Sequence, residues 1–128
     1  MTTTNNKKIL IVDDDSFLLN MYSLKFEKAG YEVVTASNGT DALAKLKEGM
    51  KPDMLVFDVI MPGMDGIELL QEVKNQHLAD NAKVLILSNQ GEQGDIDRAK
   101  KVGIDSYIVK ATSIPSEIVK SVDELLKK

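Results

Sequence analysis

The sequence predicts an α/β protein with a parallel sheet, and this prediction rests on how apolar residues are distributed along its 128 residues. Four short apolar runs each end in a polar or charged side chain; they lie at residues 9–12, 54–57, 84–87 and 107–109. An uninterrupted apolar run bounded by turn residues is typical of a strand that is buried on both faces. Between the runs, apolar residues recur at helical spacing, so strands and helices alternate along the chain.

Five strands are expected from this pattern. Besides the four apolar runs, a less regular alternation of apolar and polar residues predicts one short strand. Pro52 breaks the chain just before the apolar run that begins at Met54. That run leads directly into Asp58, which should therefore lie where the strand leaves the core, at its carboxyl end. The expected strands span residues 8–12, 32–36, 54–57, 83–87 and 106–109.

One helix is expected after each strand. Residues whose side chains can cap a first helical turn precede three of them, namely Asp15 or Ser16, Asn38 or Thr40, and Asp65. Pro115 suits the first turn of the last helix, and glycines that can end a helix stand at Gly30, Gly49 and Gly103. The expected inward faces, in chain order, are Leu18, Tyr22, Phe26 and Ala29; Ala42, Leu43 and Leu46; Ile67, Leu70 and Val73; Ile96, Ala99 and Val102; and Ile118, Val122, Leu125 and Leu126.

The number of units limits the possible topologies. Five strand–helix units are too few for an eight-stranded barrel. Right-handed crossovers between parallel strands leave helices on both faces of a sheet. We therefore expect an open, doubly wound, five-stranded parallel sheet, a (βα)5 arrangement with the flavodoxin-like strand order 2-1-3-4-5. Residues 1–7 are expected to be a disordered lead-in, and residues 8–128 to form a single domain.

Composition narrows the classes of function. A net charge of −4 and a pI near 5.0 argue against a nucleic-acid-binding protein. The chain has no cysteine, so it has no disulfide framework and no thiol chemistry, which fits a reducing cytosol. The first apolar run is too short for a signal peptide or a membrane span. We expect a cytoplasmic protein that binds neither nucleic acid nor membrane.

Acidic residues follow two strands that the expected strand order makes neighbours. Asp13 and Asp14 come directly after the first strand, and Asp58 follows the third. The carboxyl ends of parallel strands meet at one edge of a sheet, where ligands bind. Three carboxylates there repel one another, and a hard divalent cation relieves the repulsion. Mg²⁺ suits such a site, with Mn²⁺ as the alternative metal, whereas zinc does not suit a chain with no cysteine and one histidine.

A metal-binding acidic cluster beside one reactive carboxylate suits phosphoryl transfer. Asp58 would attack phosphorus in line and become an aspartyl phosphate. Ser88 and Lys110, which follow the fourth and fifth strands, would hold the other phosphoryl oxygens. The added charge of about −2 would then pull Ser88 and its loop inward.

At these residues the chain resembles a response-regulator receiver domain of two-component signalling, and its length resembles that of a stand-alone chemotaxis-type regulator. The match covers residues 8 to about 126, and the segment 58–66, D-V-I-M-P-G-M-D-G, is highly specific. The resemblance implies a phosphoacceptor regulator, not an enzyme apart from its own phosphoryl transfer and dephosphorylation. A histidine kinase or histidine phosphotransfer protein would supply the phosphate, and an unidentified downstream protein would bind around the fourth helix, fifth strand and fifth helix. The residue roles it implies are phosphoacceptor Asp58; metal ligands Asp13, Asp14, Asp58 and the backbone carbonyl of Ile60; and phosphoryl-binding and switch residues Ser88, Lys110 and Tyr107.

Three features depart from the family pattern. Ala111 follows Lys110 where the family usually has a proline after a cis bond, so a trans bond is expected here. Asn89 follows Ser88 where the family usually has a small residue, and Asn89 would either restrict access to the site or bond the phosphoryl group. The third expected departure is the absence of an output domain.

Two alternatives use the same residues differently. Asp13 and Asp15 after an apolar strand also resemble the motif of haloacid-dehalogenase-type phosphatases, with Asp13 as nucleophile and Asp15 as general acid. This chain is short for that family, lacks a cap insertion, and its segment 58–66 would be left unexplained. We expect Asp15 instead to interact with the positive end of the first helix. The second alternative is a receiver-like scaffold that acts without being phosphorylated.

Overall fold

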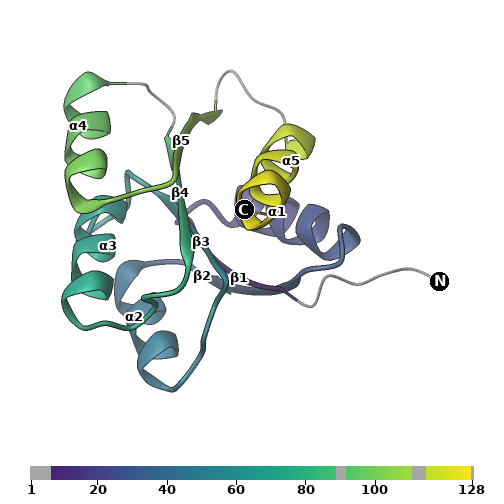
Figure 1. The fold of residues 1–128 in the computed structure, drawn as a ribbon, viewed down its shortest axis with the longest axis horizontal. Helices are drawn as coiled ribbons and strands as arrows, with labels where there is room; N and C mark the ends of the chain where they lie inside the picture. The colour runs from purple at the N-terminus through teal and green to yellow at the C-terminus, as the bar shows by residue number, and fades with distance from the viewer. Residues whose placement is uncertain (1–6, 89–91, 111–114, 128) are drawn as a thin grey trace.

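The computed structural model describes residues 7–88, 92–110 and 115–127. Its strands form one parallel sheet in the order β2-β1-β3-β4-β5, as the sequence predicts (Figure 1). Two strands extend one residue further than predicted, β3 through Asp58 and β4 through Ser88. The strands are β1 (Lys8–Val12), β2 (Glu32–Ala36), β3 (Met54–Asp58), β4 (Lys83–Ser88) and β5 (Ser106–Val109).

The helices form two layers, one on each face of the sheet (Figure 1). On one face, α1 (Ser16–Lys28) packs against α5 (Pro115–Leu126). The other face is covered by α2 (Gly39–Lys47), α3 (Gly66–Asn75) and α4 (Gln93–Val102), and α3 contacts both of its neighbours. None of the described helices combines the length and the apolar character that crossing a bilayer requires.

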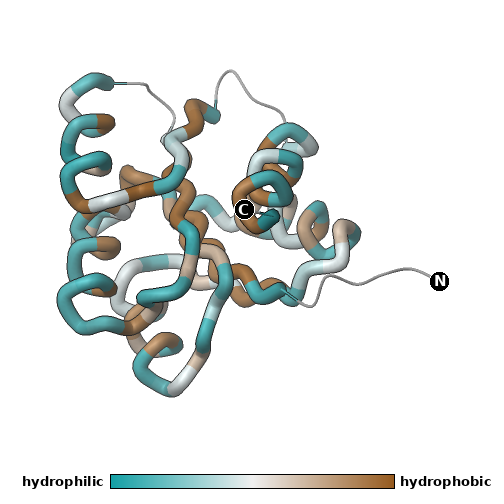
Figure 2. Tube along the Cα trace, in the orientation of Figure 1, coloured by the Kyte–Doolittle hydropathy of each residue, from teal (hydrophilic) through white to brown (hydrophobic). Residues whose placement is uncertain are grey.

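The sheet separates two apolar clusters. Successive side chains of a strand point to opposite faces, so each central strand contributes to both clusters. Figure 2 shows apolar segments concentrated in the strands and on the sides of the helices that face the sheet. The cluster beneath α1 and α5 contains Ile9, Ile11, Met54 and Val56, and the cluster beneath α2, α3 and α4 contains Leu10, Val12, Leu55 and Phe57.

The buried face of α1 differs from the predicted one. Leu19 is buried together with Tyr22 and Phe26, whereas Leu18 and Ala29 are only partly buried. The prediction placed Leu18, Tyr22, Phe26 and Ala29 together on one buried face. Because α1 packs against both the sheet and α5, the centre is rotated toward Leu19. Partial burial also applies to other residues predicted to face inward, namely Leu43, Ile96, Val102, Leu125 and Leu126.

Side-chain caps fix the starts of three helices and settle two open alternatives. Asp15 caps α1 by accepting hydrogen bonds from the amides of Phe17 and Leu18, so Ser16 is the first helical residue. Asn38 caps α2 by accepting one from the amide of Asp41. Asp65 caps α3 and is described with that helix below. These helix starts follow the strands closely and hold the intervening turns at the edge of the sheet where the strands end.

Candidate acidic site at the carboxyl edge of the sheet

Four polar side chains come from the carboxyl ends of four neighbouring strands. Asp13 follows β1, Asp58 ends β3, Ser88 ends β4 and Lys110 follows β5. The register of β1 against β3 places Asp13 beside Asp58 as the chain leaves the sheet. Asp13, Asp58 and Ser88 are all buried. Buried polar side chains need hydrogen-bonding or oppositely charged partners, and a lysine is the partner of the two buried acids.

Lys110 lies between the two buried acids. Its Nζ atom lies 2.8 Å from Oδ2 of Asp13 and 3.2 Å from Oδ1 of Asp58. The lysine side chain is only 7% exposed, so these contacts are made with little access to water. The second oxygen of Asp13, Oδ1, accepts a hydrogen bond of 2.9 Å from the amide of Asp15. The lysine and the turn after β1 therefore fix the orientation of the Asp13 carboxylate.

Burial and charge shift the pKa values of this cluster. Burial raises the pKa of Asp58 to about 6, although the charge of Lys110 opposes that shift; the nearby charge of Asp13 adds to it. Burial alone would lower the pKa of Lys110, but its hydrogen bond to Asp13 and the charge of Asp58 raise it above the ordinary lysine value. Lys110 is therefore a permanent cation at neutral pH, and the cluster has two carboxylates for one ammonium. The charge imbalance favours binding of a further cation.

Asp14 joins the two buried acids to form a set of three carboxylates. Asp13, Asp14 and Asp58 each offer one carboxylate oxygen, and these three oxygens lie within 4.8 Å of one another. Asp14 is exposed, unlike the other two. A set made only of carboxylate oxygens, open to solvent on one side, fits a hard cation such as Mg²⁺, which keeps several waters. Ile60 lies in the turn after β3 with its side chain 61% exposed. The metal-binding role of its backbone carbonyl stays a prediction.

The backbone at the start of α3 packs closely against the backbone of Asp58. Gly66, the first residue of α3, donates a hydrogen bond of 2.8 Å to the carbonyl oxygen of Val59. A Cβ atom on Gly66 would lie 2.0 Å from the carbonyl oxygen of Asp58, which is closer than any side chain tolerates. Only glycine lets the start of α3 contact the end of β3 in this way. Gly66 was part of the distinctive segment in the sequence, but its packing role required the structure.

The predicted switch residues lie on the α4 side of this edge, as far as the structure describes them. Ser88 is buried at the end of β4, and Tyr107 is half-buried in β5, where it packs against the cluster beneath α2, α3 and α4. Tyr107 also lines a groove of about 400 Å³ between β5 and α4. Asn89 and Ala111 lie outside the described residues, so their predicted effects on access and on the peptide bond after the lysine stay predictions.

Tyr22 is a neighbour of the acidic site that sequence reasoning treated only as a core residue. It is buried in α1, and burial raises the pKa of its hydroxyl. The charge of Lys110 lowers that pKa, while the charges of Asp13 and Asp58 raise it, so the ring is electrostatically coupled to the cluster. The available signal was a polar hydroxyl on an otherwise apolar helix face, because a buried tyrosine usually directs its hydroxyl toward polar groups.

Comparisons with known proteins agree with this arrangement. The family model for the response regulator receiver domain matches residues 9–123. The chemotaxis protein CheY of Thermotoga maritima is 38% identical over 116 residues, covering 90% of this chain and 93% of that protein. The alkaline phosphatase synthesis transcriptional regulatory protein PhoP of Bacillus subtilis is 37% identical over 116 residues, covering 91% of this chain. The chain spans only 47% of PhoP and about half of several other transcriptional regulators that it matches.

Solved structures show the same similarity. Chemotaxis protein CheY4 of Vibrio cholerae superposes with a TM-score of 0.86 at 32% identity, covering 93% of this chain and 98% of that one. A putative response regulator from Chloroflexus aurantiacus also gives a TM-score of 0.86, at 33% identity, covering 97% and 100%. The fold and the acidic edge define a receiver domain of two-component signalling. The chain belongs to the response regulator receiver domain family.

Proposed function

We propose that Asp58 is the phosphoacceptor of this receiver domain and that Asp13, Asp14, Asp58 and the backbone carbonyl of Ile60 hold the Mg²⁺ ion, for which Mn²⁺ could substitute. The observation that carries the proposal is the position of Lys110, buried between Asp13 and Asp58 at 2.8 and 3.2 Å. A buried cation beside two carboxylates, in a cluster that still carries excess negative charge, fits a site for a metal ion and a phosphoryl group together.

The residues of the site divide the reaction between them. An oxygen of the Asp58 carboxylate attacks phosphorus, the bond from phosphorus to the donor imidazole nitrogen breaks, and its electron pair stays with the imidazole. Bound Mg²⁺ would offset charge on the transferring phosphoryl group. Lys110 and Ser88 donate hydrogen bonds to phosphoryl oxygens, the first as a point charge and the second as a hydroxyl. Asp13 holds Lys110 in place, since one of its oxygens accepts from the lysine and the other from the amide of Asp15.

Phosphorylation of Asp58 would act on the surface formed by α4, β5 and α5. Ser88 ends β4 five positions before α4 begins, and Tyr107 lies in β5 and lines the groove between β5 and α4. An aspartyl phosphate that draws Ser88 inward would change the environment of Tyr107 and the exposed face of α4. We propose that a histidine kinase or histidine phosphotransfer protein supplies the phosphoryl group, and that a downstream protein binds the changed surface. We also propose a cytoplasmic location, which fits the absence of cysteine.

The phosphatase alternative has no support. Both assigned acids have other roles, because Asp15 is the exposed cap of α1 and Asp13 binds Lys110. The scaffold alternative differs from our proposal in a single property, the chemical competence of Asp58. It therefore shares the same decisive experiment.

Intact-mass measurement after incubation with Mg²⁺ and a small acyl phosphate tests the proposal. We expect a gain of one phosphoryl group that requires Mg²⁺ and is lost in Asp58→Asn. Asp15→Asn is the matched control, because asparagine also caps a helix and the variant removes an acid that the phosphatase alternative needs. Phosphorylation that persists in Asp58→Asn, or is lost in Asp15→Asn alone, would contradict the assignment. A folded protein that gains nothing, even from a purified histidine kinase, would favour the scaffold.

A further inference from the structure

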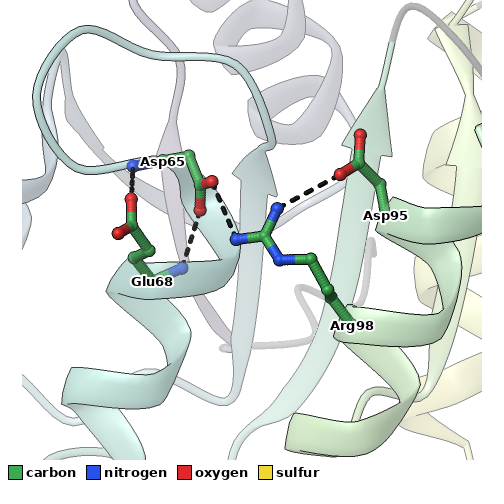
Figure 3. Close-up of polar contacts among 4 residues, drawn as sticks. All are labelled: Asp65, Glu68, Asp95 and Arg98. Atoms are coloured by element: carbon green, nitrogen blue, oxygen red, sulfur yellow. Dashed lines mark hydrogen bonds and ion pairs between the residues drawn. The ribbon is translucent and has the colours of Figure 1, made fainter.

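An arginine links α3 and α4 away from the acidic site. Arg98, in the second turn of α4, places Nη2 at 2.9 Å from Oδ2 of Asp65 and Nη1 at 3.1 Å from Oδ1 of Asp95 (Figure 3). One guanidinium thus bridges a residue of its own helix and a residue 33 positions earlier in the chain. The planar fork of arginine suits this double contact, which a lysine could make only in part.

Asp65 is fixed by more than its contact with Arg98. Its Oδ1 atom accepts a hydrogen bond of 2.8 Å from the amide of Glu68, and Oε1 of Glu68 accepts one of 3.0 Å from the amide of Asp65 (Figure 3). This reciprocal cap determines where α3 begins. The next residue is Gly66, whose backbone lies against the carbonyl of Asp58. The carboxylate that Arg98 binds therefore belongs to the turn that follows Asp58.

The other carboxylate of the bridge belongs to the helix that follows β4 in the sequence. Asp95 is in the first turn of α4, and α4 begins at Gln93, five positions after Ser88. Arg98 consequently joins the start of α3, which follows Asp58, to the start of α4, which follows Ser88. Figure 3 shows the guanidinium lying between the two helices, with one carboxylate on each side.

We propose that Arg98 is a positioning residue whose ion pair with Asp65 holds the start of α4 against the turn that follows Asp58, and so opposes the movement of Ser88 and the change in α4 that we assign to phosphorylation. The inference rests on the proposed function of Asp58. A contact that is shorter in one state than in the other biases the equilibrium toward the first. Loss of the ion pair should therefore favour the state that holds a phosphoryl group.

The size of this bias follows from solvent exposure. The Arg98 side chain is 46% exposed and that of Asp65 is 25% exposed, so water screens the pair. Exposed ion pairs contribute modestly, and we expect removal of this one to change the affinity for a phosphoryl analogue by about two- to fivefold. The coupling is reciprocal, so a bound analogue should weaken the contact by the same factor.

A double-mutant cycle on Arg98→Gln and Asp65→Asn tests the inference. Asparagine is as good a cap as aspartate, so Asp65→Asn keeps the start of α3 and removes only the charge. Two quantities are measured: amide hydrogen exchange of α4 in the unphosphorylated protein, and the affinity for beryllofluoride with Mg²⁺. We expect each single variant to exchange faster in α4 and to bind the analogue more tightly, and the double variant to add nothing further. Arg98→Lys should restore part of the wild-type behaviour.

Lys101→Gln is the matched control. It removes one positive charge from α4, and within the part of the chain that the structure describes Lys101 forms no ion pair. It should leave both quantities unchanged. Additive effects in the double variant, or an equal effect of Lys101→Gln, overturn the inference. Faster exchange with unchanged affinity for beryllofluoride also overturns it, because the contact would then be merely structural. A wild-type protein that binds no analogue overturns the proposed function and this inference with it, an outcome that the wild-type titration alone identifies.

Discussion

Nζ of Lys110 lies 3.2 Å from Oδ1 of Asp58, yet this ion pair does not keep the pKa of Asp58 at its ordinary value. Burial raises that pKa from 3.8 to about 6 and outweighs the attraction of the lysine. The charged carboxylate is therefore less stable in the folded protein than in the unfolded chain. A buried carboxylate whose pKa is raised in this way is typical of a functional site.

Replacing Asp58 by Asn should stabilise the metal-free protein at pH 7 by about 1–2 kcal/mol. Because the folded-state pKa is the higher one, the folded protein binds a proton more tightly between pH 4 and 6. This group therefore makes wild-type stability rise as pH falls through about 6, and the variant lacks that rise. Urea unfolding of both proteins from pH 7 to pH 4 measures the difference, which should shrink with falling pH. A variant less stable than the wild type at pH 7 would contradict the electrostatic account.

Replacing Lys110 by Gln should destabilise the protein by about 3 kcal/mol at neutral pH, because it leaves two buried carboxylates without their cation. Part of this loss should be recovered near pH 5, where Asp58 takes up a proton. Lys8→Gln is the control, since its ion pair with Glu32 is exposed and should contribute about 0–1 kcal/mol. Equal losses in the two variants, measured by denaturant unfolding, would show that burial of the Lys110 contacts has no energetic consequence.

Replacing Gly66 by Ala should destabilise the protein by about 2 kcal/mol or more and slow the phosphorylation of Asp58, because the added methyl group must displace the Asp58 carbonyl. Gly94→Ala provides the contrast. Gly94 lies in α4, and a Cβ there would meet no atom within 4 Å, so alanine should stabilise by up to about 1 kcal/mol. Melting temperatures and acyl phosphate labelling rates report both effects. A normally labelled, stable Gly66→Ala protein would show that the turn can relax.

Mg²⁺ should raise the melting temperature, and the shift should grow with the logarithm of the Mg²⁺ concentration above the dissociation constant, because a ligand that binds only the folded state stabilises it by about 2.7 kcal/mol at one hundred times that constant. Asp13→Asn and Asp14→Asn should each reduce the shift, and a chelator should abolish it. Asp80→Asn, which alters an exposed acid outside the cluster, should leave it unchanged. Equal shifts in all these variants would place the metal elsewhere.

Much of the fold was predictable because its signals are local. Apolar runs, caps and glycines gave the order of strands and helices, and parallel topology then placed Asp13, Asp58, Ser88 and Lys110 at one edge. The exact ends of β3 and β4 differed by one residue, because pairing with neighbouring strands continues through the first polar residue. Arg98 and Asp65 could not be paired from the sequence, since their contact depends on how α3 packs against α4. The rotation of the α1 face toward Leu19 likewise depends on α5.

Burial is uneven across the sheet, and this has a consequence for how the molecule can change shape. Every residue of β3 is buried, whereas all four residues of β5 are only half-buried and α4 fully buries Ala99 alone among its apolar residues. Local opening requires less free energy where fewer apolar contacts are lost. The β5 edge and α4 can therefore rearrange at a fraction of the global free energy of unfolding, while the strands that carry the acids keep their places. The acidic site and the proposed switch surface thus lie in parts of the protein that differ in local stability.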